Sequence, residues 1–245
     1  MALISLEHVS KVYPKGTRPA LDDISLDIDR GDFVFLVGAS GSGKTTLLSL
    51  LLREEEATDG EIRVAGNDLR RLSARQVPHY RRQIGFIFQG FNLISSLTAV
   101  ENVELPLVYR GMGRQERREI AEKALARVGL DKRMHHLPAE MSGGQQQRVA
   151  VARAIAAAPP VILADEPTGN LDTKSTKEVM AILHRLKDEG RTVVVITHDN
   201  EIAMEAERVV RIRDGKIVED YINPGFEEKY GRESKKDNAN PIDQG

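Results

Sequence analysis

The sequence predicts an α/β fold in which a mainly parallel sheet carries helices on its faces. Three observations lead to this prediction. Short apolar runs bounded by turn signals alternate with helical patterns along the chain. Some of these runs are apolar throughout, as in buried central strands, whereas others alternate apolar and polar residues. One long segment, residues 91–158, shows helical patterns and no buried strand, and it is predicted to be a helical insert into the sheet core.

The strands fall into two groups. Alternation of apolar and polar residues predicts half-exposed strands at Ile4–His8, Ile24–Ile28 and Glu61–Ala65. Continuous apolar runs predict buried central strands at Phe33–Val37, Val161–Ala164 and Val193–Ile196.

Two helices have readable faces. Gln115–Val128 places Ile120, Ala124, Leu125 and Val128 on one side and charged residues on the other. Lys174–Asp188 carries apolar residues at helical spacing and stops at Gly190, a residue type that favours the C′ position. After Tyr221 the chain offers little to bury, so residues 222–245 are predicted to be a polar, disordered tail.

Composition excludes several classes of protein. The 245 residues carry 35 Lys+Arg against 37 Asp+Glu, a net charge of −2, which argues against broad nucleic-acid binding. The absence of cysteine excludes a disulfide scaffold, a thiol nucleophile and cysteine-bound zinc. No run reaches the roughly 18 apolar residues of a membrane span, and no signal peptide is readable at the amino terminus. We therefore expect a cytoplasmic chain that reaches a membrane only through a partner.

A phosphate-binding loop follows the apolar run at 33–37. Residues 38–45, GASGSGKT, match G-x-x-x-x-G-K-[ST] in full and precede a helical run. Glycines in such a loop let backbone N–H groups surround phosphates, Lys44 neutralises their charge, and the Thr45 hydroxyl can bind Mg²⁺. The sequence therefore predicts binding of a nucleoside triphosphate with Mg²⁺. The predicted contacts are Gly38, Ala39, Ser40, Gly41, Ser42, Gly43, Lys44, Thr45 and Thr46.

Two carboxylates end the apolar run at 161–164. Asp165 is predicted to bind Mg²⁺ through the hydration shell of the ion, because strand ends of an open α/β sheet meet beside the phosphate loop. Glu166 is one residue further and could accept a proton from an attacking water. The alternative, a solvated strand end, is less favoured beside a complete phosphate loop. We expect hydrolysis as well as binding.

A third motif, Ser142-Gly143-Gly144-Gln145, opens a helical run. Serine at an N-cap followed by glycines exposes N–H groups at a helix start, which makes a second anion site. By itself this motif is a weak signal.

Together these motifs resemble those of the ATP-binding subunits of ABC transporters, over roughly residues 2–220. SGGQQ at 142–146 resembles the family signature, VILADEP at 161–167 the Walker B strand, and NLD at 170–172 the D-loop. Gln89 in IGFIFQ is similar to the Q-loop glutamine, His198 in VVVITHD to the switch histidine, and Tyr13 in SKVY to the aromatic residue that stacks on adenine.

The resemblance implies how the chain is divided into subdomains and what the motif residues do. It implies a P-loop NTPase core with an antiparallel β subdomain, formed by residues 2–89 and 159–221, and a helical subdomain at 90–158. Gln89 would reach Mg²⁺ and the attacking water, and His198 the γ-phosphate. Family members form head-to-tail dimers, so each ATP would lie between the phosphate loop of one subunit and Ser142, Gly143, Gly144 and Gln145 of the other.

The resemblance also implies a membrane subunit whose coupling helix enters a groove beside the Q-loop. We expect the wall of that groove at residues 89–94 and 97–103, where apolar side chains are frequent. The alternative is that these side chains pack inside the helical insert.

Different parts of the sequence resemble different subfamilies of this family. Residues 9–85 are similar to FtsE, the cell-division ATPase that works with FtsX, whereas the chain from Phe88 onward is more similar to LolD and MacB, ATPases of lipoprotein release and macrolide export. The groove segment departs from the FtsE pattern, so we favour a partner of the MacB or LolC/LolE type over FtsX. In all three cases the chain would lie on the inner face of the membrane through its partner.

Two other classes of nucleotide-binding protein fit the sequence less well. A DNA-associated ABC-type ATPase would need a long heptad insert or a basic face, and this sequence has neither, so no nucleic acid is expected as a partner. A regulatory protein that binds nucleotide without hydrolysing it is opposed by the presence of Glu166 and His198.

Overall fold

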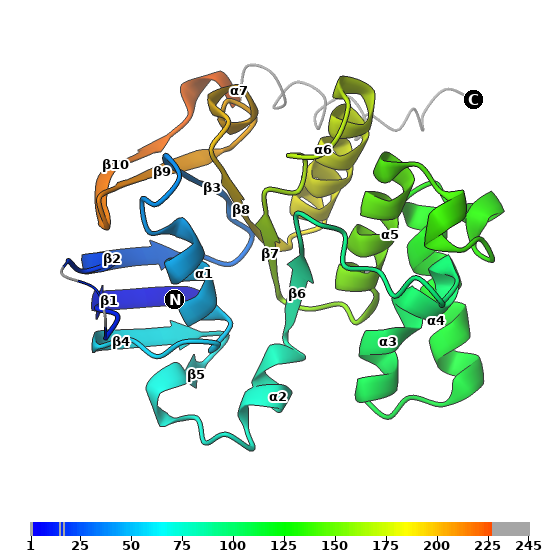
Figure 1. Cartoon of the computed structure of the whole chain (residues 1–245), viewed down its shortest axis with the longest axis horizontal. Helices are drawn as coiled ribbons and strands as arrows, with labels where there is room; N and C mark the ends of the chain where they lie inside the picture. Colours follow the sequence, from blue (N-terminus) through cyan, green and yellow to red (C-terminus); the bar gives the residue numbers. More distant parts are fainter. Residues whose placement is uncertain (1, 15, 17, 227–245) are drawn as a thin grey trace, which may run out of the picture.

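A computed structural model describes residues 2–14, 16 and 18–226. Two β-sheets and a group of helices make up this part of the chain (Figure 1). The strands are β1 (Ile4–Lys11), β2 (Leu21–Ile28), β3 (Phe33–Val37), β4 (Asp59–Val64), β5 (Asn67–Asp68), β6 (Ile84–Ile87), β7 (Val161–Asp165), β8 (Thr192–Thr197), β9 (Arg208–Arg213) and β10 (Lys216–Ile222). The α-helices are α1 (Lys44–Leu51), α2 (Val77–Arg81), α3 (Ala99–Tyr109), α4 (Arg114–Arg127), α5 (Gly143–Ala156), α6 (Thr173–Asp188) and α7 (Asn200–Ala203). The 3-10 helices are η1 (Leu69–Arg71), η2 (Asp131–Arg133) and η3 (Pro138–Glu140).

The larger sheet has the strand order β10-β9-β3-β8-β7-β6. All neighbours in it run parallel except β10 and β9, so the predicted mainly parallel sheet is confirmed. The prediction did not include β6, β9 or β10. In this order β3 and β7 both neighbour β8, which brings their carboxyl ends to one edge of the sheet.

The smaller sheet is antiparallel and has the order β2-β1-β4-β5. It contains the three strands whose sequences alternate apolar and polar residues. Their apolar side chains face the core, because neighbouring residues of a strand point to opposite faces of the sheet. The expected antiparallel subdomain is therefore present.

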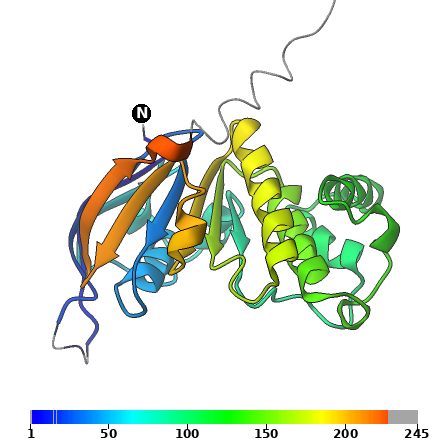
Figure 2. The same ribbon diagram turned by 90° about the horizontal axis from the view of Figure 1, so that it is seen from above.

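The larger sheet divides the core into two clusters. Along β3, Phe33, Phe35 and Val37 belong to the cluster under α5 and α6, whereas Val34 and Leu36 belong to the cluster under α1 and the smaller sheet. Figure 2 shows these two layers on opposite faces of the sheet. A strand covered on both faces needs apolar residues at every position, which is why this run is continuous in the sequence.

The helical segment contains α3, α4 and α5. A capping box between Thr98 and Glu101 starts α3, and the apolar face of that helix packs against the other two. Val100 and Val103 are fully buried there. The expectation that residues 97–103 form an exposed groove wall is therefore wrong for α3, because its apolar side chains are part of the core.

Helix α6 ends as the sequence predicts. Gly190 has a φ of +79° directly after the last helical turn. Its N–H bonds the carbonyl of Lys187, and the N–H of Arg191 bonds the carbonyl of Leu186. These two bonds form a Schellman motif and confirm Gly190 as the C′ residue.

The chain stays packed after β10, contrary to the prediction of a disordered tail from residue 222. The Asn223 side chain donates to the carbonyls of Met204 and Ala206, and Phe226 is 5% exposed with its ring 6.4 Å from that of Phe33. These contacts stabilise residues 222–226 on the edge of the core. Residues 227–245 lie outside the described part of the chain.

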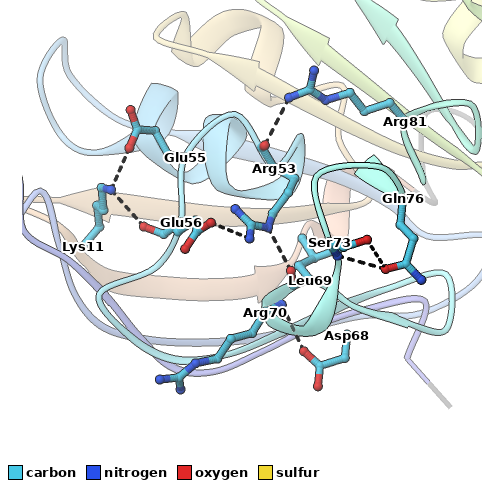
Figure 3. Close-up of polar contacts among 10 residues, drawn as sticks. All are labelled: Lys11, Arg53, Glu55, Glu56, Asp68, Leu69, Arg70, Ser73, Gln76 and Arg81. Atoms are coloured by element: carbon cyan, nitrogen blue, oxygen red, sulfur yellow. Dashed lines mark hydrogen bonds and ion pairs between the residues drawn. The ribbon is translucent and has the colours of Figure 1, made fainter. Parts of the chain in front are cut away.

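The end of α1 is held by side chains from elsewhere in the fold. The Tyr80 hydroxyl donates to the carbonyl of Leu51, and the Arg81 guanidinium donates to the carbonyl of Leu52 at 2.8 Å. The Arg81 guanidinium also donates to the carbonyl of Arg53 at 3.1 Å (Figure 3). Three carbonyls at or just after the helix end thus find donors.

Among the described residues, every helix falls short of the length and apolarity that crossing a membrane requires.

Candidate nucleotide-binding site

The loop between β3 and α1 has the backbone that its glycines permit. A Cβ atom on Gly38 would lie 2.3 Å from the carbonyl oxygen of Ile212. Gly43 has a φ of +111°, and a Cβ there would lie 2.6 Å from the carbonyl oxygen of Ala20. Side chains at either position would collide with backbone, so the close turn of the loop depends on glycine.

The loop leads into α1 without a side-chain cap. Gly43 occupies the N-cap position and no side chain accepts from the first turn of the helix, which leaves backbone N–H groups for an anion. The Lys44 ammonium lies over the loop and donates to the carbonyls of Gly38 at 2.6 Å and Ala39 at 2.8 Å. Burial lowers the pKa of Lys44, and the carboxylates of Glu166 and Asp165 partly oppose this effect.

A cavity of about 410 Å³ opens beside the loop. It is lined by residues of four separate segments: the residue before β2, the phosphate loop with the start of α1, the end of β7 and the end of β8. The lining residues are Ala20, Ser40, Gly41, Gly43, Lys44, Thr45, Thr46, Asp165, Glu166, Ile196 and His198. The parallel sheet therefore brings together most of the catalytic and phosphate-loop residues that the sequence predicts.

Asp165 is the last residue of β7 and is partly buried. Burial raises the pKa of this carboxyl group, the neighbouring Glu166 raises it further, and Lys44 lowers it. A cation in the cavity would stabilise the ionised form of Asp165.

Glu166 has its carboxylate held from two sides. Its Oε1 atom lies 2.7 Å from Nδ1 of His198, and its Oε2 atom accepts a hydrogen bond from Nε2 of Gln89 at 3.0 Å. The backbone of Glu166 has a φ of +44°, a conformation that is uncommon for residues other than glycine, and its N–H bonds the carbonyl of Ile196. These contacts fix the carboxylate at the wall of the cavity, as a general base requires.

Gln147, which lies outside the predicted motifs, and Asn170 of the NLD motif hold the backbone around the Q-loop. Gln147 of α5 is fully buried, and its amide donates to the carbonyls of Pro167 at 2.7 Å and Phe88 at 3.4 Å. The Asn170 amide donates to the carbonyl of Gln89 at 3.2 Å. Gln147 precedes the buried Ala150 and Val151 by three and four residues, so it lies on the apolar face of the helix. A polar residue at such a position in the sequence is a signal of a buried side chain that bonds the backbone.

Ser142 is the N-cap of α5, as predicted. Its hydroxyl accepts from the N–H of Gln145, and the Gln145 side chain accepts from the N–H of Ser142, which makes a capping box. A Cβ on Gly144 would lie 2.2 Å from Oγ of Ser175, so glycine allows α5 to pack closely on the start of α6. None of residues 142–145 lines the cavity.

Tyr13 also lies outside the residues that line the cavity. It follows β1 and is partly exposed. The Lys11 ammonium stands 4.9 Å from the centre of its ring and is fixed by Glu55 at 2.7 Å. One face of the ring thus meets a cation.

The oxygen atoms that the chain offers at the cavity suit Mg²⁺ only together with phosphate oxygens of the nucleotide. In the described part of the chain, no group of three or more His, Cys, Asp or Glu residues is placed to hold a metal ion. Thr45 and Asp165 supply a hydroxyl and one carboxylate at the cavity. Mg²⁺ is commonly held by one or two carboxylates together with substrate phosphates, so these residues fit the ion.

Comparison with known sequences finds similarity over most of the chain. A family model described as "ABC transporter" matches residues 21–169. The "Macrolide export ATP-binding/permease protein MacB" of Escherichia coli K12 is 51% identical over 219 residues, 88% of this chain and 34% of that protein. MacB 1 of E. coli O1:K1 is 50% identical over 230 residues, 93% of this chain and 35% of that protein. The chain spans about a third of the length of these relatives.

Solved structures show the same fold. A dimeric structure of the ATP-binding cassette MJ0796 in a post-hydrolysis state, bound to ADP and Pi, has a TM-score of 0.82 and 42% sequence identity. The match covers 91% of this chain and 100% of the chain in the solved structure. A second dimeric structure, described as a bacterial ABC transporter cassette, has a TM-score of 0.82 and 43% identity over the same shares.

Proposed function

The chain belongs to the ABC transporter family as one of its ATP-hydrolysing cassettes, and on this premise we propose that it works as a homodimer that drives a separate membrane subunit. The dimer would bind two ATP molecules with Mg²⁺ and would lie on the inner face of the membrane through that subunit. The observation that carries the hydrolytic part of the proposal is the Glu166 carboxylate, held by Gln89 and His198 at the wall of the cavity.

Each of these residues has a role in the reaction of ATP with water to give ADP and phosphate. Backbone N–H groups of the phosphate loop and the Lys44 ammonium hold the β- and γ-phosphates. Glu166 takes a proton from the water that attacks the γ-phosphorus. His198 orients Glu166 and contacts the γ-phosphate, and Gln89 positions the water. Bound Mg²⁺, held by Thr45, Gln89 and Asp165, would neutralise charge on the phosphates.

The dimer explains why two parts of the predicted site lie apart in one chain. Ser142, Gly143, Gly144 and Gln145 do not line the cavity, so a single subunit contacts ATP without them. A second copy, arranged head to tail, would supply these residues and the start of α5 to the γ-phosphate. The similar cassette MJ0796 is dimeric in both solved structures, which supports a dimer of this chain. Tyr13 would stack on the adenine at the other end of the nucleotide.

The membrane subunit is proposed to be of the MacB or LolC/LolE type. Identity of 50–51% to macrolide export proteins that combine an ATP-binding part with a permease supports this type. These relatives extend well beyond the region that the chain matches. The alternative is a cell-division ATPase of the FtsE type acting with FtsX, and co-purification of the membrane partner separates the two.

Replacement of the general base tests the proposed reaction. We expect Glu166→Gln to bind ATP, to form a stable dimer in ATP, and to lose at least about 100-fold in kcat, because general base catalysis contributes roughly 10²–10⁴-fold. Light scattering measures the dimer and phosphate release measures turnover. A variant that stays monomeric in saturating ATP, or that retains the wild-type rate, would contradict the proposal.

A further inference from the structure

The side chain of Lys11 is buried although it carries a charge. Lys11 is the last residue of β1 and is 8% exposed. Lysine is almost never buried unless a partner compensates its charge, so this position indicates a specific environment for the ammonium group. Lys11 does not line the phosphate-loop cavity, and the proposed reaction assigns it no part.

Two groups beyond the carboxyl end of α1 hold the Lys11 ammonium. It donates to Oε2 of Glu55 at 2.7 Å and to the backbone carbonyl of Glu56 at 2.8 Å (Figure 3). The Glu55 side chain is 41% exposed, so its carboxylate also meets solvent. Two such bonds leave the long lysine side chain little freedom, and the position of its charge is therefore fixed.

The fixed ammonium stands over the ring of Tyr13. Its nitrogen lies 4.9 Å from the centre of that ring. A cation within about 6 Å of the centroid is attracted to the electron-rich face of an aromatic ring. Tyr13 is partly exposed, and in the described part of the chain its ring contacts no other aromatic ring. The cation therefore favours one orientation of a side chain that could otherwise change rotamer.

The backbone next to Tyr13 is held from the same side. The Thr58 hydroxyl oxygen accepts a hydrogen bond from the N–H of Val12 at 3.0 Å. The N–H of Thr58 donates to the carbonyl of Ser10 at 2.8 Å. Residues 53–58, which we call the post-α1 segment, thus hold both the ring of Tyr13, through Lys11, and the backbone that leads to it.

The post-α1 segment continues from the helix that begins at the phosphate loop. Helix α1 starts at Lys44, and the segment starts two residues after the helix ends. Arg53 fixes the segment, because its guanidinium pairs with Glu56 at 2.6 Å and donates to the carbonyl of Leu69 at 2.9 Å (Figure 3). One continuous stretch of chain therefore joins the phosphate loop to the groups that support the ring.

We propose that Lys11 is a positioning residue for the adenine base: its ammonium, fixed by Glu55, occupies one face of the Tyr13 ring, and the base stacks on the opposite face. The stacking itself rests on the proposed function, whereas its dependence on Lys11 and Glu55 goes beyond it. A ring that is held in place before binding loses less conformational freedom when the base stacks on it. The cation also draws electron density to its own side, which reduces the repulsion between the facing π-systems of tyrosine and adenine.

ADP and inorganic pyrophosphate separate recognition of the base from recognition of the phosphates. Both offer phosphates to the loop, but only ADP carries the base. Lys11→Met removes the charge and keeps an unbranched side chain that can pack in the same space. We expect its Kd for ADP, with Mg²⁺, to rise by about 3- to 10-fold, the range expected for loss of a cation–π contact, and its Kd for pyrophosphate to stay unchanged. Calorimetric titration of the full chain measures both.

The kinetic constants for ATP give a second readout. Lys11→Met should raise the KM for ATP by a similar factor with kcat unchanged, because Lys11 touches neither the phosphates nor Glu166 in the proposed reaction. Lys11→Arg should bind ADP within about twofold of the wild type, since a guanidinium also stacks on an aromatic ring and pairs with a carboxylate.

Two further variants show that the effect passes through the ring. In the Tyr13→Ala background, Lys11→Met should cause no additional loss of ADP affinity, because no ring remains to be positioned. Lys187→Met is the matched control. Its ammonium stands 5.1 Å from the centre of the Phe226 ring, it does not line the cavity, and its loss should leave the Kd for ADP unchanged.

Thermal melting establishes which variants are folded. Should Lys11→Met fail to fold, Glu55→Gln keeps the ammonium and weakens its anchor, and we expect its Kd for ADP to rise by about twofold. Wild-type affinity in the folded variant, an equal loss for ADP and pyrophosphate, or a further loss in the Tyr13→Ala background would overturn the proposal. Unchanged ADP affinity in Tyr13→Ala refutes the stacking within the proposed function, whereas a loss there without a loss in Lys11→Met refutes the role of Lys11 alone.

Discussion

The Nδ1 atom of His198 lies 2.7 Å from the Oε1 atom of Glu166. The two residues stand 32 positions apart in the chain, one just after β8 and the other just after β7. Neighbouring parallel strands place them at the same sheet edge. The contact orients the carboxylate while leaving its other oxygen to Gln89.

Loss of this contact should slow the chemical step. We expect His198→Ala to lower kcat by about 10- to 100-fold, less than the roughly 10²–10⁴-fold that a general base contributes, because Glu166 remains but is held on one side only. The Kd for ATP should change little. His79→Ala removes an exposed histidine that does not line the cavity and serves as the control. Wild-type turnover in His198→Ala, measured by phosphate release, would exclude the positioning role.

The ionised carboxylate of Asp165 should lower the stability of the unliganded chain at neutral pH. Its pKa is raised in the folded state by burial and by Glu166, so ionisation opposes folding as the pH rises from the unfolded pKa toward the folded one. Above that window the penalty is constant. Asp165→Asn removes it, and we expect a Tm higher by a few degrees at pH 7, since about 1 kcal/mol moves the Tm of a chain of this size by roughly 2–4 °C.

The same substitution should weaken the response to Mg²⁺. Addition of Mg²⁺ with ATP is expected to raise the Tm of the wild type more than that of Asp165→Asn, because the variant lacks the carboxylate that faces the cation. At pH 4 the Tm difference without nucleotide should shrink, since wild-type Asp165 is then increasingly protonated. Scanning calorimetry at both pH values measures this. A lower Tm for Asp165→Asn than for the wild type at pH 7 without nucleotide would contradict the prediction.

Two adjacent glycines should respond differently to alanine. A Cβ on Gly144 meets Ser175 Oγ at 2.2 Å, whereas the nearest atom to a Cβ on Gly143 is 3.5 Å away on Phe91. We expect Gly144→Ala to reduce the free energy of unfolding by about 1–3 kcal/mol, the usual cost of overpacking, and Gly143→Ala to be tolerated by the monomer.

A second substitution distinguishes a steric cause from a loss of helix capping. Ser175→Gly removes both atoms that a Cβ on Gly144 would strike, so the double variant should recover part of the lost stability. Denaturant unfolding of the four proteins gives the coupling free energy. Additive effects would show that the two residues do not clash.

The Tyr13 ring should contribute to ATP binding without affecting the chemical step. Tyr13→Ala is expected to raise the KM for ATP by about 5- to 150-fold with kcat unchanged, because stacking of a base on an aromatic ring contributes roughly 1–3 kcal/mol. Tyr13→Phe keeps the ring over the Lys11 ammonium and should behave as the wild type. Equal effects of the two substitutions would point to the hydroxyl group instead of stacking.

The sequence alone predicts the parts of this protein that depend on local chemistry. The phosphate loop requires glycines at fixed spacing, and continuous apolar runs such as Phe33–Val37 occur where a strand is covered on both faces. Gly190 marks a helix end because its φ of +79° disfavours a side chain. Such signals need no knowledge of distant residues.

Tertiary structure decides what lies next to what. The apolar residues Val100 and Val103 look the same in sequence whether they line a groove or fill the core, and only the packing of α3 on its neighbours places them inside. Phe226 belongs to a polar stretch in sequence but finds a site beside Phe33. A hollow of about 460 Å³ is lined by residues of α2, β6, α3 and α5, which spread along the chain from Pro78 to Ala157. Burial and the pairing of charges depend on neighbours distant in the chain, and these exist only once the chain has folded.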